Sequence, residues 1–185
     1  SQLDENSERI YLTDGGHIEN LGVYELLRRR VRTIVVVDGE ADGAMDFGAF
    51  VRLQRFARID LGVTIDLPWQ SIRAATLAVS RGEAPPPDAA HVAIGAIDYG
   101  DAKGTLVYVK SSLTGDENDY IRDYARRNPA FPHETTGDQF FSEEQFEVYR
   151  ALGFHAVHGA FTRPGTVAGL PAGAGPAGFT ALLAR

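Results

Sequence analysis

The sequence predicts an α/β fold in three layers around a mainly parallel sheet, and three observations support this prediction. Short runs of β-branched residues alternate with segments in which apolar residues recur at helical spacing. The first two of these runs end at Asp-Gly dipeptides, which are typical of tight loops after strands. Hydrophobic residues make up 44% of the 185 residues and charged residues 23%, the ordinary composition of a globular domain.

The first predicted elements are a strand, a helix and a second strand. Residues 10–13 form a short strand that stops at Asp14, and a helix begins near Asn20, whose side chain we expect to cap it. The continuous β-branched run at 33–37 predicts a strand that is covered on both faces. Two strands joined through a helix imply a parallel crossover.

The later elements follow from the same patterns. A helix capped by Asp46 is followed by a strand at 63–67 and by an antiparallel hairpin at 91–98 and 105–109 on an edge of the sheet. A further helix is predicted at 116–127. The last helix begins at the cap Ser142, ends near residue 157, and packs Phe146, Tyr149 and Leu152. Residues 164–178 are almost all glycine, alanine and proline, so we expect them to be flexible or loosely packed. The predicted organisation is one domain over residues 1–160 and a tail over residues 161–185.

Charge and residue usage exclude several classes of protein. The net charge of −7 argues against nucleic acid as a partner, since binding to phosphates needs clustered basic residues. The absence of cysteine excludes a disulfide framework, a thiolate zinc site and a cysteine nucleophile. The basic run Arg28-Arg29-Arg30 favours the dipole of its helix, and its contact with an anionic membrane surface stays open.

No apolar stretch approaches the roughly 20 residues that span a bilayer, and the N-terminus has no signal-peptide pattern. We therefore expect a protein that is cytoplasmic or peripheral to a membrane, with any anchor outside this chain. Met45 is the only methionine, so we also expect the sequence to be part of a longer chain.

A carboxylate at the end of a predicted strand is the strongest functional signal. Asp14 is followed by Gly15 and Gly16, which permit a tight loop, and by Asn20 six residues later. An aspartate in this position can accept the proton of a serine hydroxyl if its oxygen lies within about 2.6–3.2 Å. The dipeptide Asp-Gly by itself is more typical of an ordinary turn.

The wider motif around Asp14, residues 11–26, resembles the aspartate motif of bacterial patatin-like phospholipases and, more distantly, that of cytosolic phospholipase A2. Its core is Asp-Gly-Gly with an asparagine six residues after the aspartate. The resemblance continues through residues 28–42 and reappears at 131–141 and 145–150, so it spans most of residues 10–157.

The resemblance implies a serine–aspartate dyad that hydrolyses a lipid ester without a histidine, a cofactor or a metal. Asp14 would be its base, Gly15 and Gly16 would shape the loop, and Asn20 would orient it. The family's nucleophile lies in Gly-X-Ser-X-Gly and its oxyanion hole in a glycine-rich loop, and neither motif occurs here.

The nearest approach to that nucleophile motif surrounds Ser80, which follows the aspartate and lacks the first glycine, so we expect Ser80 to be a surface residue. The nucleophile is instead expected upstream, in the N-terminal remainder of the same domain, and this chain alone is expected to be inactive. A phospholipid or another lipid ester is the expected substrate of the whole protein. Two alternatives stay open: a non-catalytic lipid-binding or interaction module, and a thioesterase or acyltransferase that uses the same dyad.

Other polar residues receive a simpler interpretation. His17 and Glu19 follow Asp14 closely, but the dyad needs neither, and two ligands do not make a metal site. The alternating acidic residues after the second strand are interpreted as a solvated loop rather than a divalent-cation site: Asp38, Glu40 and Asp42. His133 is assigned no role beyond ordering a helix junction.

Overall fold

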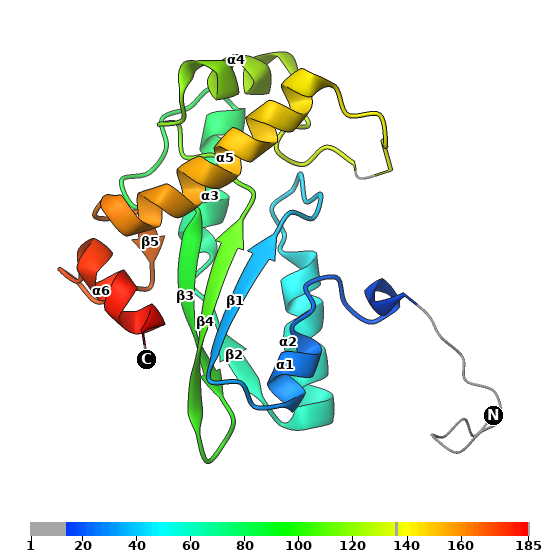
Figure 1. Cartoon of the computed structure of the whole chain (residues 1–185), viewed down its shortest axis with the longest axis vertical. Coiled ribbons are helices and arrows are strands. Elements are labelled where there is room, and N and C mark those ends of the chain that lie inside the picture. The colour runs from blue at the N-terminus through cyan, green and yellow to red at the C-terminus, as the bar shows by residue number, and fades with distance from the viewer. Residues whose placement is uncertain (1–13, 136, 185) are drawn as a thin grey trace.

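The computed structural model describes residues 14–135 and 137–184, and in these residues five strands form one mixed sheet (Figure 1). The strands are β1 (Thr33–Asp38), β2 (Thr64–Asp66), β3 (Val92–Asp98), β4 (Lys103–Lys110) and β5 (Val167–Ala168). The helices are the 3₁₀ turn η1 (Gly15–His17), α1 (Tyr24–Arg28), α2 (Gly48–Leu61), α3 (Gln70–Ser80), α4 (Asp119–Arg127), α5 (Glu143–Thr162) and α6 (Gly175–Leu183). The predicted α/β class is confirmed.

The described strands follow the order β1-β4-β3-β2, with β5 beside β3. β1 is parallel to β4 and β5 is parallel to β3, whereas the β3–β4 and β2–β3 pairs are antiparallel. The predicted hairpin is therefore confirmed, but its predicted place on an edge is wrong, because β4 pairs with β1 and β3 pairs with β2. The predicted strand at residues 10–13 and its crossover lie outside the described residues.

One face of the sheet packs against α1, α2 and α3. Side chains alternate along a strand, so Ile34 and Val36 of β1 share this face with Leu106 and Tyr108 of β4. The helices contribute a set of buried apolar side chains: Leu27, Phe50, Leu53, Ala57 and Ile72. Gly62 ends α2 with a φ of 67°, a conformation that favours glycine, and turns the chain into β2.

The opposite face of β3 and β4 is covered by α5 and α6. Val92, Val107 and Val109 form a buried cluster with side chains of α5 and with Phe179 of α6. The prediction of a flexible or loosely packed segment at residues 164–178 is therefore wrong at β5, which pairs with β3, although none of residues 164–178 is fully buried. Glycine and alanine offer little surface to bury, but Phe179 and strand β5 attach the tail to the sheet.

β1 differs from the prediction because it is covered on one face only. Val35 is 57% exposed and Val37 is 76% exposed, since α5 and α6 pack on β3 and β4 and not on β1. Within the described residues, β1 also forms the outer strand of the sheet (Figure 1). An apolar, unpaired strand edge is a surface on which further chain can pack.

The predicted helix caps are corrected in two places. Glu19, and not Asn20, receives backbone N–H groups at the start of the first helix, those of Leu21 and Tyr24. Asp42 receives the N–H groups of Asp46 and Phe47 before α2, so Asp46 is not the cap.

The helix at 142 begins as predicted, with the Ser142 hydroxyl accepting the N–H of Gln145. It runs on to Thr162, beyond the predicted end. Leu152 is buried and Tyr149 packs against the same cluster, but Phe146 is 66% exposed, because Val148 and Ala151 occupy the inward face instead. Helix α3 was not predicted.

Candidate functional site

Asp14 lies exposed at the start of the η1 turn, in extended backbone geometry. Its Oδ1 accepts the N–H of Gly16 at 2.9 Å, and its carbonyl accepts the N–H of His17 at 3.1 Å. Within the described residues, Oδ2 accepts no hydrogen bond. The turn therefore fixes one carboxylate oxygen, while the second has no donor among the described residues.

Gly16 lies close to the side chain of Asn20. A Cβ atom on Gly16 would lie 2.7 Å from Asn20 Oδ1, so the Asn20 amide would have to move if Gly16 were replaced. A Cβ on Gly15 would meet nothing within 4 Å. Asn20 donates from Nδ2 to Glu40 Oε1 at 2.8 Å, so it connects the Asp14 turn to the loop after β1.

That loop carries a buried ion pair where two parallel strands end. Asp38 and Lys110 are register partners at the carboxyl ends of β1 and β4, with 3% and 1% of their surfaces exposed. Lys110 Nζ lies 2.9 Å from Asp38 Oδ2 and 3.2 Å from the Glu40 carbonyl oxygen. Carboxyl ends of strands are where open α/β sheets usually hold functional groups.

The expectation of a solvated loop at residues 38–42 is therefore wrong. The cation that Asp38 meets is the ammonium of Lys110, and Asp42 Oδ2 lies 4.0 Å from the same nitrogen. The Tyr108 hydroxyl donates to Asp38 as well. Burial, together with the Asp38 carboxylate, raises the pKa of Tyr108 far above its usual range, so this hydroxyl keeps its proton.

His133 also lies near this network. Its ring nitrogens are buried and have no partner of good hydrogen-bond geometry among the described residues, although the Glu40 backbone lies near the ring. Burial and, after it, the positive charge of Lys110 lower the pKa of His133. The adjacent Pro132 carbonyl accepts the Ser111 hydroxyl at 3.2 Å, so the segment at 131–133 is attached to the end of β4. The segment at 131–133 therefore lies beside the Asp38–Lys110 pair although it is far from Asp38 in the sequence.

No serine of the described segments makes a hydrogen bond to Asp14. Ser80 is exposed at the end of α3, as predicted. Ser112 is fully buried and pairs with His91. Ser111 donates to Pro132, and Ser142 caps α5. Residues 14–135 and 137–184 therefore provide a candidate base but no nucleophile for it.

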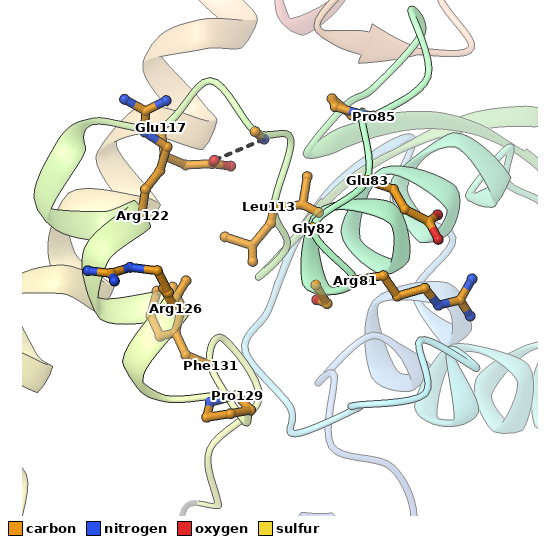
Figure 2. A pocket seen from close by; sticks show the side chains of 14 residues that line it. Arg81, Gly82, Glu83, Pro85, Leu113, Glu117, Arg122, Arg126, Pro129 and Phe131 are labelled. Carbon is orange, nitrogen blue, oxygen red and sulfur yellow. Dashed lines mark hydrogen bonds between the residues drawn. The ribbon is translucent and has the colours of Figure 1, made fainter.

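A cleft of about 590 Å³ lies between the end of α3 and the start and end of α4 (Figure 2). Its apolar lining includes Val79, Leu113 and Phe131, and Arg122 and Arg126 come from α4. Asp14 is not among the lining residues, so this cleft and the Asp14 turn are separate features.

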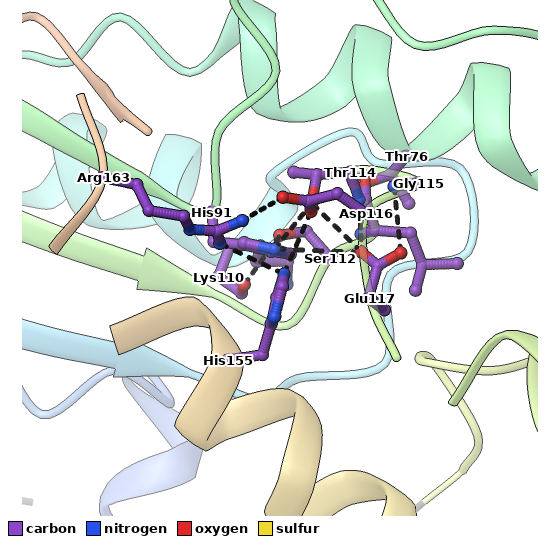
Figure 3. Close-up of polar contacts among 11 residues, drawn as sticks. Thr76, His91, Lys110, Ser112, Thr114, Gly115, Asp116, Glu117, His155 and Arg163 are labelled. Carbon is purple, nitrogen blue, oxygen red and sulfur yellow. Dashed lines mark hydrogen bonds and ion pairs between the residues drawn. The ribbon is translucent and has the colours of Figure 1, made fainter. Parts of the chain in front are cut away.

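A second polar cluster was not found from the sequence. It consists of His91, Asp116, Glu117 and His155, whose ligand-type atoms all lie within 4.8 Å of one another (Figure 3). Burial, followed by the nearby His155, lowers the pKa of His91 to about 3, so its ring is neutral at neutral pH. These residues come from three separate elements and form no motif, so nothing in the sequence pattern could have grouped them.

No helix in the described part of the chain is long and apolar enough to cross a bilayer. Comparison of the chain with protein families, with curated proteins and with solved structures finds no match. The resemblance to patatin-like phospholipases therefore stays a hypothesis that rests on the motif residues and their arrangement.

Proposed function

We propose that this chain supplies the catalytic base of a lipid acyl hydrolase, with Asp14 as the base of a serine–aspartate dyad. The observation that carries the proposal is the state of the Asp14 carboxylate: it is exposed, it is oriented through Oδ1, and no donor of the described residues bonds its Oδ2. A general base must reach its proton donor directly and must be held in place by its surroundings.

The support behind Asp14 fits that role. Asn20 lies against the turn at Gly16 and donates to Glu40, and the Glu40 carbonyl approaches the Lys110–Asp38 ion pair. A chain of contacts thus runs from the exposed carboxylate to a buried pair at the ends of β1 and β4. Supporting residues of this kind limit the movement of a catalytic group, because their own side chains are fixed.

In the proposed reaction, a serine hydroxyl from outside the printed sequence attacks the acyl carbon of a phospholipid or related lipid ester. Asp14 Oδ2 takes the hydroxyl proton as the Oγ–C bond forms. It then gives this proton to the leaving oxygen as the ester C–O bond breaks, so the alcohol departs neutral and Asp14 is again a carboxylate. Water then hydrolyses the acyl-enzyme, with Asp14 again as base. The scheme uses no cofactor and no metal.

The uncovered face of β1 supports this division of the site. Val35 and Val37 are exposed on the strand whose carboxyl end bears Asp38, and the strand's outer edge is unpaired among the described residues. We propose that the serine-bearing part of the protein packs there. The burial of two valines would stabilise that contact by about 1.5–3 kcal/mol for each side chain.

One observation favours a different function, a non-catalytic lipid-binding or interaction module: no serine of the described segments reaches Asp14. A fluorophosphonate probe, which reacts with activated serines, distinguishes the hydrolase from the binding module. Labelling of the full-length protein, but not of the 185-residue chain, is expected for the dyad. Absence of labelling in both folded samples would support the binding module.

Asp14→Asn in the full-length protein is expected to lower kcat on a lipid ester about 10²–10⁴-fold, because a general base is lost. Asp88→Asn is the matched control, since Asp88 is also an exposed loop aspartate. The unfolding transition of each variant shows whether the fold is intact. Full activity of a folded Asp14→Asn protein would exclude Asp14 as the base. Faster turnover of thioesters than of lipid esters would assign the same dyad to a thioesterase. Transfer of the acyl group to an alcohol instead of water would assign it to an acyltransferase.

A further inference from the structure

Four ligand-type side chains meet where three elements come together, away from the Asp14 turn. His91 directly precedes β3, Asp116 and Glu117 lie between β4 and α4, and His155 lies on α5 (Figure 3). His155 Nε2 is 3.0 Å from Asp116 Oδ1, and His91 Nε2 is 3.8 Å from Glu117 Oε1. His91 and the Glu117 side chain are almost completely buried.

The hydrogen bonds of Ser112 decide which nitrogen of His91 faces the cluster as an acceptor. The Ser112 hydroxyl has one proton and donates it to the Lys110 carbonyl at 2.9 Å. Its contact with His91 Nδ1, also 2.9 Å, must therefore be an N–H donated by the ring. The lone pair of Nε2 then points toward the carboxylates. Metal-binding histidines are usually oriented in this way, by a hydrogen bond from the other ring nitrogen.

Three acceptors of the cluster lie near the single hydroxyl of Thr114. Thr114 Oγ lies 2.9 Å from His91 Nε2, 2.6 Å from Asp116 Oδ1 and 3.2 Å from Glu117 Oε1, but it has a single proton to donate. Two of these three acceptors therefore receive no proton from Thr114. Glu117 already accepts the N–H groups of Thr114 and Gly115, and Asp116 pairs with His155 and Arg163. If Thr114 donates to Asp116, the nearest of its three acceptors, the buried Nε2 of His91 is the acceptor left without a proton. An unsatisfied acceptor in a buried site is costly, and a cation held with the neighbouring carboxylates would satisfy it.

We propose that His91, Asp116, Glu117 and His155 bind one divalent transition-metal ion of the zinc class. Two imidazole nitrogens and two carboxylate oxygens form a ligand set that zinc accepts, with bonds of about 2.0–2.2 Å in a tetrahedral arrangement. Ligand atoms in such a site are about 3.3–3.6 Å apart, so the largest separation of 4.8 Å needs a modest inward movement. His155 and Asp116 can provide it, because both side chains are partly exposed.

Arg163 is compatible with this ion. Its guanidinium pairs with Asp116 Oδ2, which leaves Oδ1 toward His155 and the interior of the cluster. Arg163 Nη2 also lies 3.3 Å from His155 Nε2 and would move away when that nitrogen binds the metal. The two carboxylates, Arg163 and a divalent ion sum to one positive charge, against one negative charge without the ion. The bound metal would cross-link β3, the loop before α4, and α5.

The test is a titration of EDTA-treated, dialysed full-length protein with ZnCl₂ by calorimetry, and with CoCl₂ by visible absorption. We expect one-to-one Zn²⁺ binding and the ligand-field bands of four-coordinate Co²⁺. His155→Gln and Asp116→Asn are each expected to weaken Zn²⁺ binding at least tenfold. His158→Gln is the matched control, because His158 is an exposed histidine on the same helix and lies outside the cluster.

Circular dichroism in EDTA shows whether each variant folds. If His155→Gln does not fold, the comparison with the wild-type protein is made with Asp116→Asn alone. Absence of one-to-one Zn²⁺ binding in the wild-type protein would overturn the proposal, and the cluster would then be a hydrogen-bonded network only. Equal weakening by His158→Gln and His155→Gln would overturn it as well. The readout is metal binding, so it does not depend on the proposed hydrolase activity.

Discussion

Lys110→Met is the sharpest test of the network behind the Asp14 turn. The substitution keeps a side chain of similar length but removes the ammonium that lies 2.9 Å from Asp38 Oδ2. Asp38 would then be a buried carboxylate whose remaining side-chain donor is the Tyr108 hydroxyl. Removal of one partner from a buried pair costs about 3–5 kcal/mol, because the other charge stays buried without compensation.

For a protein of this size, 1 kcal/mol changes Tm by about 2–4 °C, so the expected loss is about 6–20 °C. Urea unfolding followed by circular dichroism gives the free energy of unfolding. Asp38→Asn should also lower the free energy of unfolding, but by less, since the ammonium keeps the Glu40 carbonyl oxygen at 3.2 Å and Asp42 Oδ2 at 4.0 Å. The double variant Asp38→Asn/Lys110→Met should be clearly more stable than the sum of the single losses predicts, because neither charge is then left alone.

Arg122→Gln is the control for an exposed pair. Arg122 and Asp119 are i,i+3 neighbours on α4 with largely exposed side chains, and such pairs contribute at most about 1 kcal/mol. If Lys110→Met costs no more than this control, or if the two single losses simply add in the double variant, Asp38 and Lys110 do not act as a buried pair.

Two further predictions test the tail and the histidine near the network. Phe179→Ala should lower the free energy of unfolding by about 3–5 kcal/mol, because Phe179 is buried in the cluster under α6. The control is Phe140→Ala, at a residue that is 91% exposed, which should change it by less than about 0.5 kcal/mol. Equal effects of the two substitutions in urea unfolding would contradict the packing of Phe179. Burial and Lys110 lower the pKa of His133 in the folded state, so the unfolded chain binds more protons than the folded protein as the pH falls. This difference lowers the stability of the folded protein below about pH 6.5. His133→Gln removes it and should make that loss of stability shallower. Urea midpoints at pH 7.5 and 5.5 measure this difference, and identical pH slopes for the two proteins would refute it.

Some features that depend on neighbouring residues could be predicted from the sequence, although the caps before α1 and α2 were assigned to the wrong residues. The Ser142 cap needs only the N–H of Gln145, three residues later, and the Asp14 turn needs only the N–H of Gly16. The antiparallel hairpin likewise follows from two apolar runs around one short turn. In each case the stabilising contact joins residues of one cap, one turn or one hairpin, so the local sequence pattern contains the necessary information.

Features that depend on which elements lie side by side could not be predicted. The valine-rich run of β1 is the same sequence whether one face or both are covered, and only the position of α5 and α6 over β3 and β4 leaves Val35 and Val37 exposed. The composition of the tail predicts little burial, yet Phe179 packs into a hydrophobic cluster formed by β3, β4 and α5. Burial of a side chain is a property of its neighbours in space.

By itself, the sequence determined the α/β class and the cap of α5, and it predicted Asp14 as the base. The tertiary structure alone decided that Asp38 is the partner of Lys110, because the parallel register of β1 on β4 places residues 72 positions apart side by side. It also decided that His91, Asp116, Glu117 and His155 converge. Charged and polar side chains pair over a few ångströms, and strand register and helix packing set those distances regardless of separation along the chain.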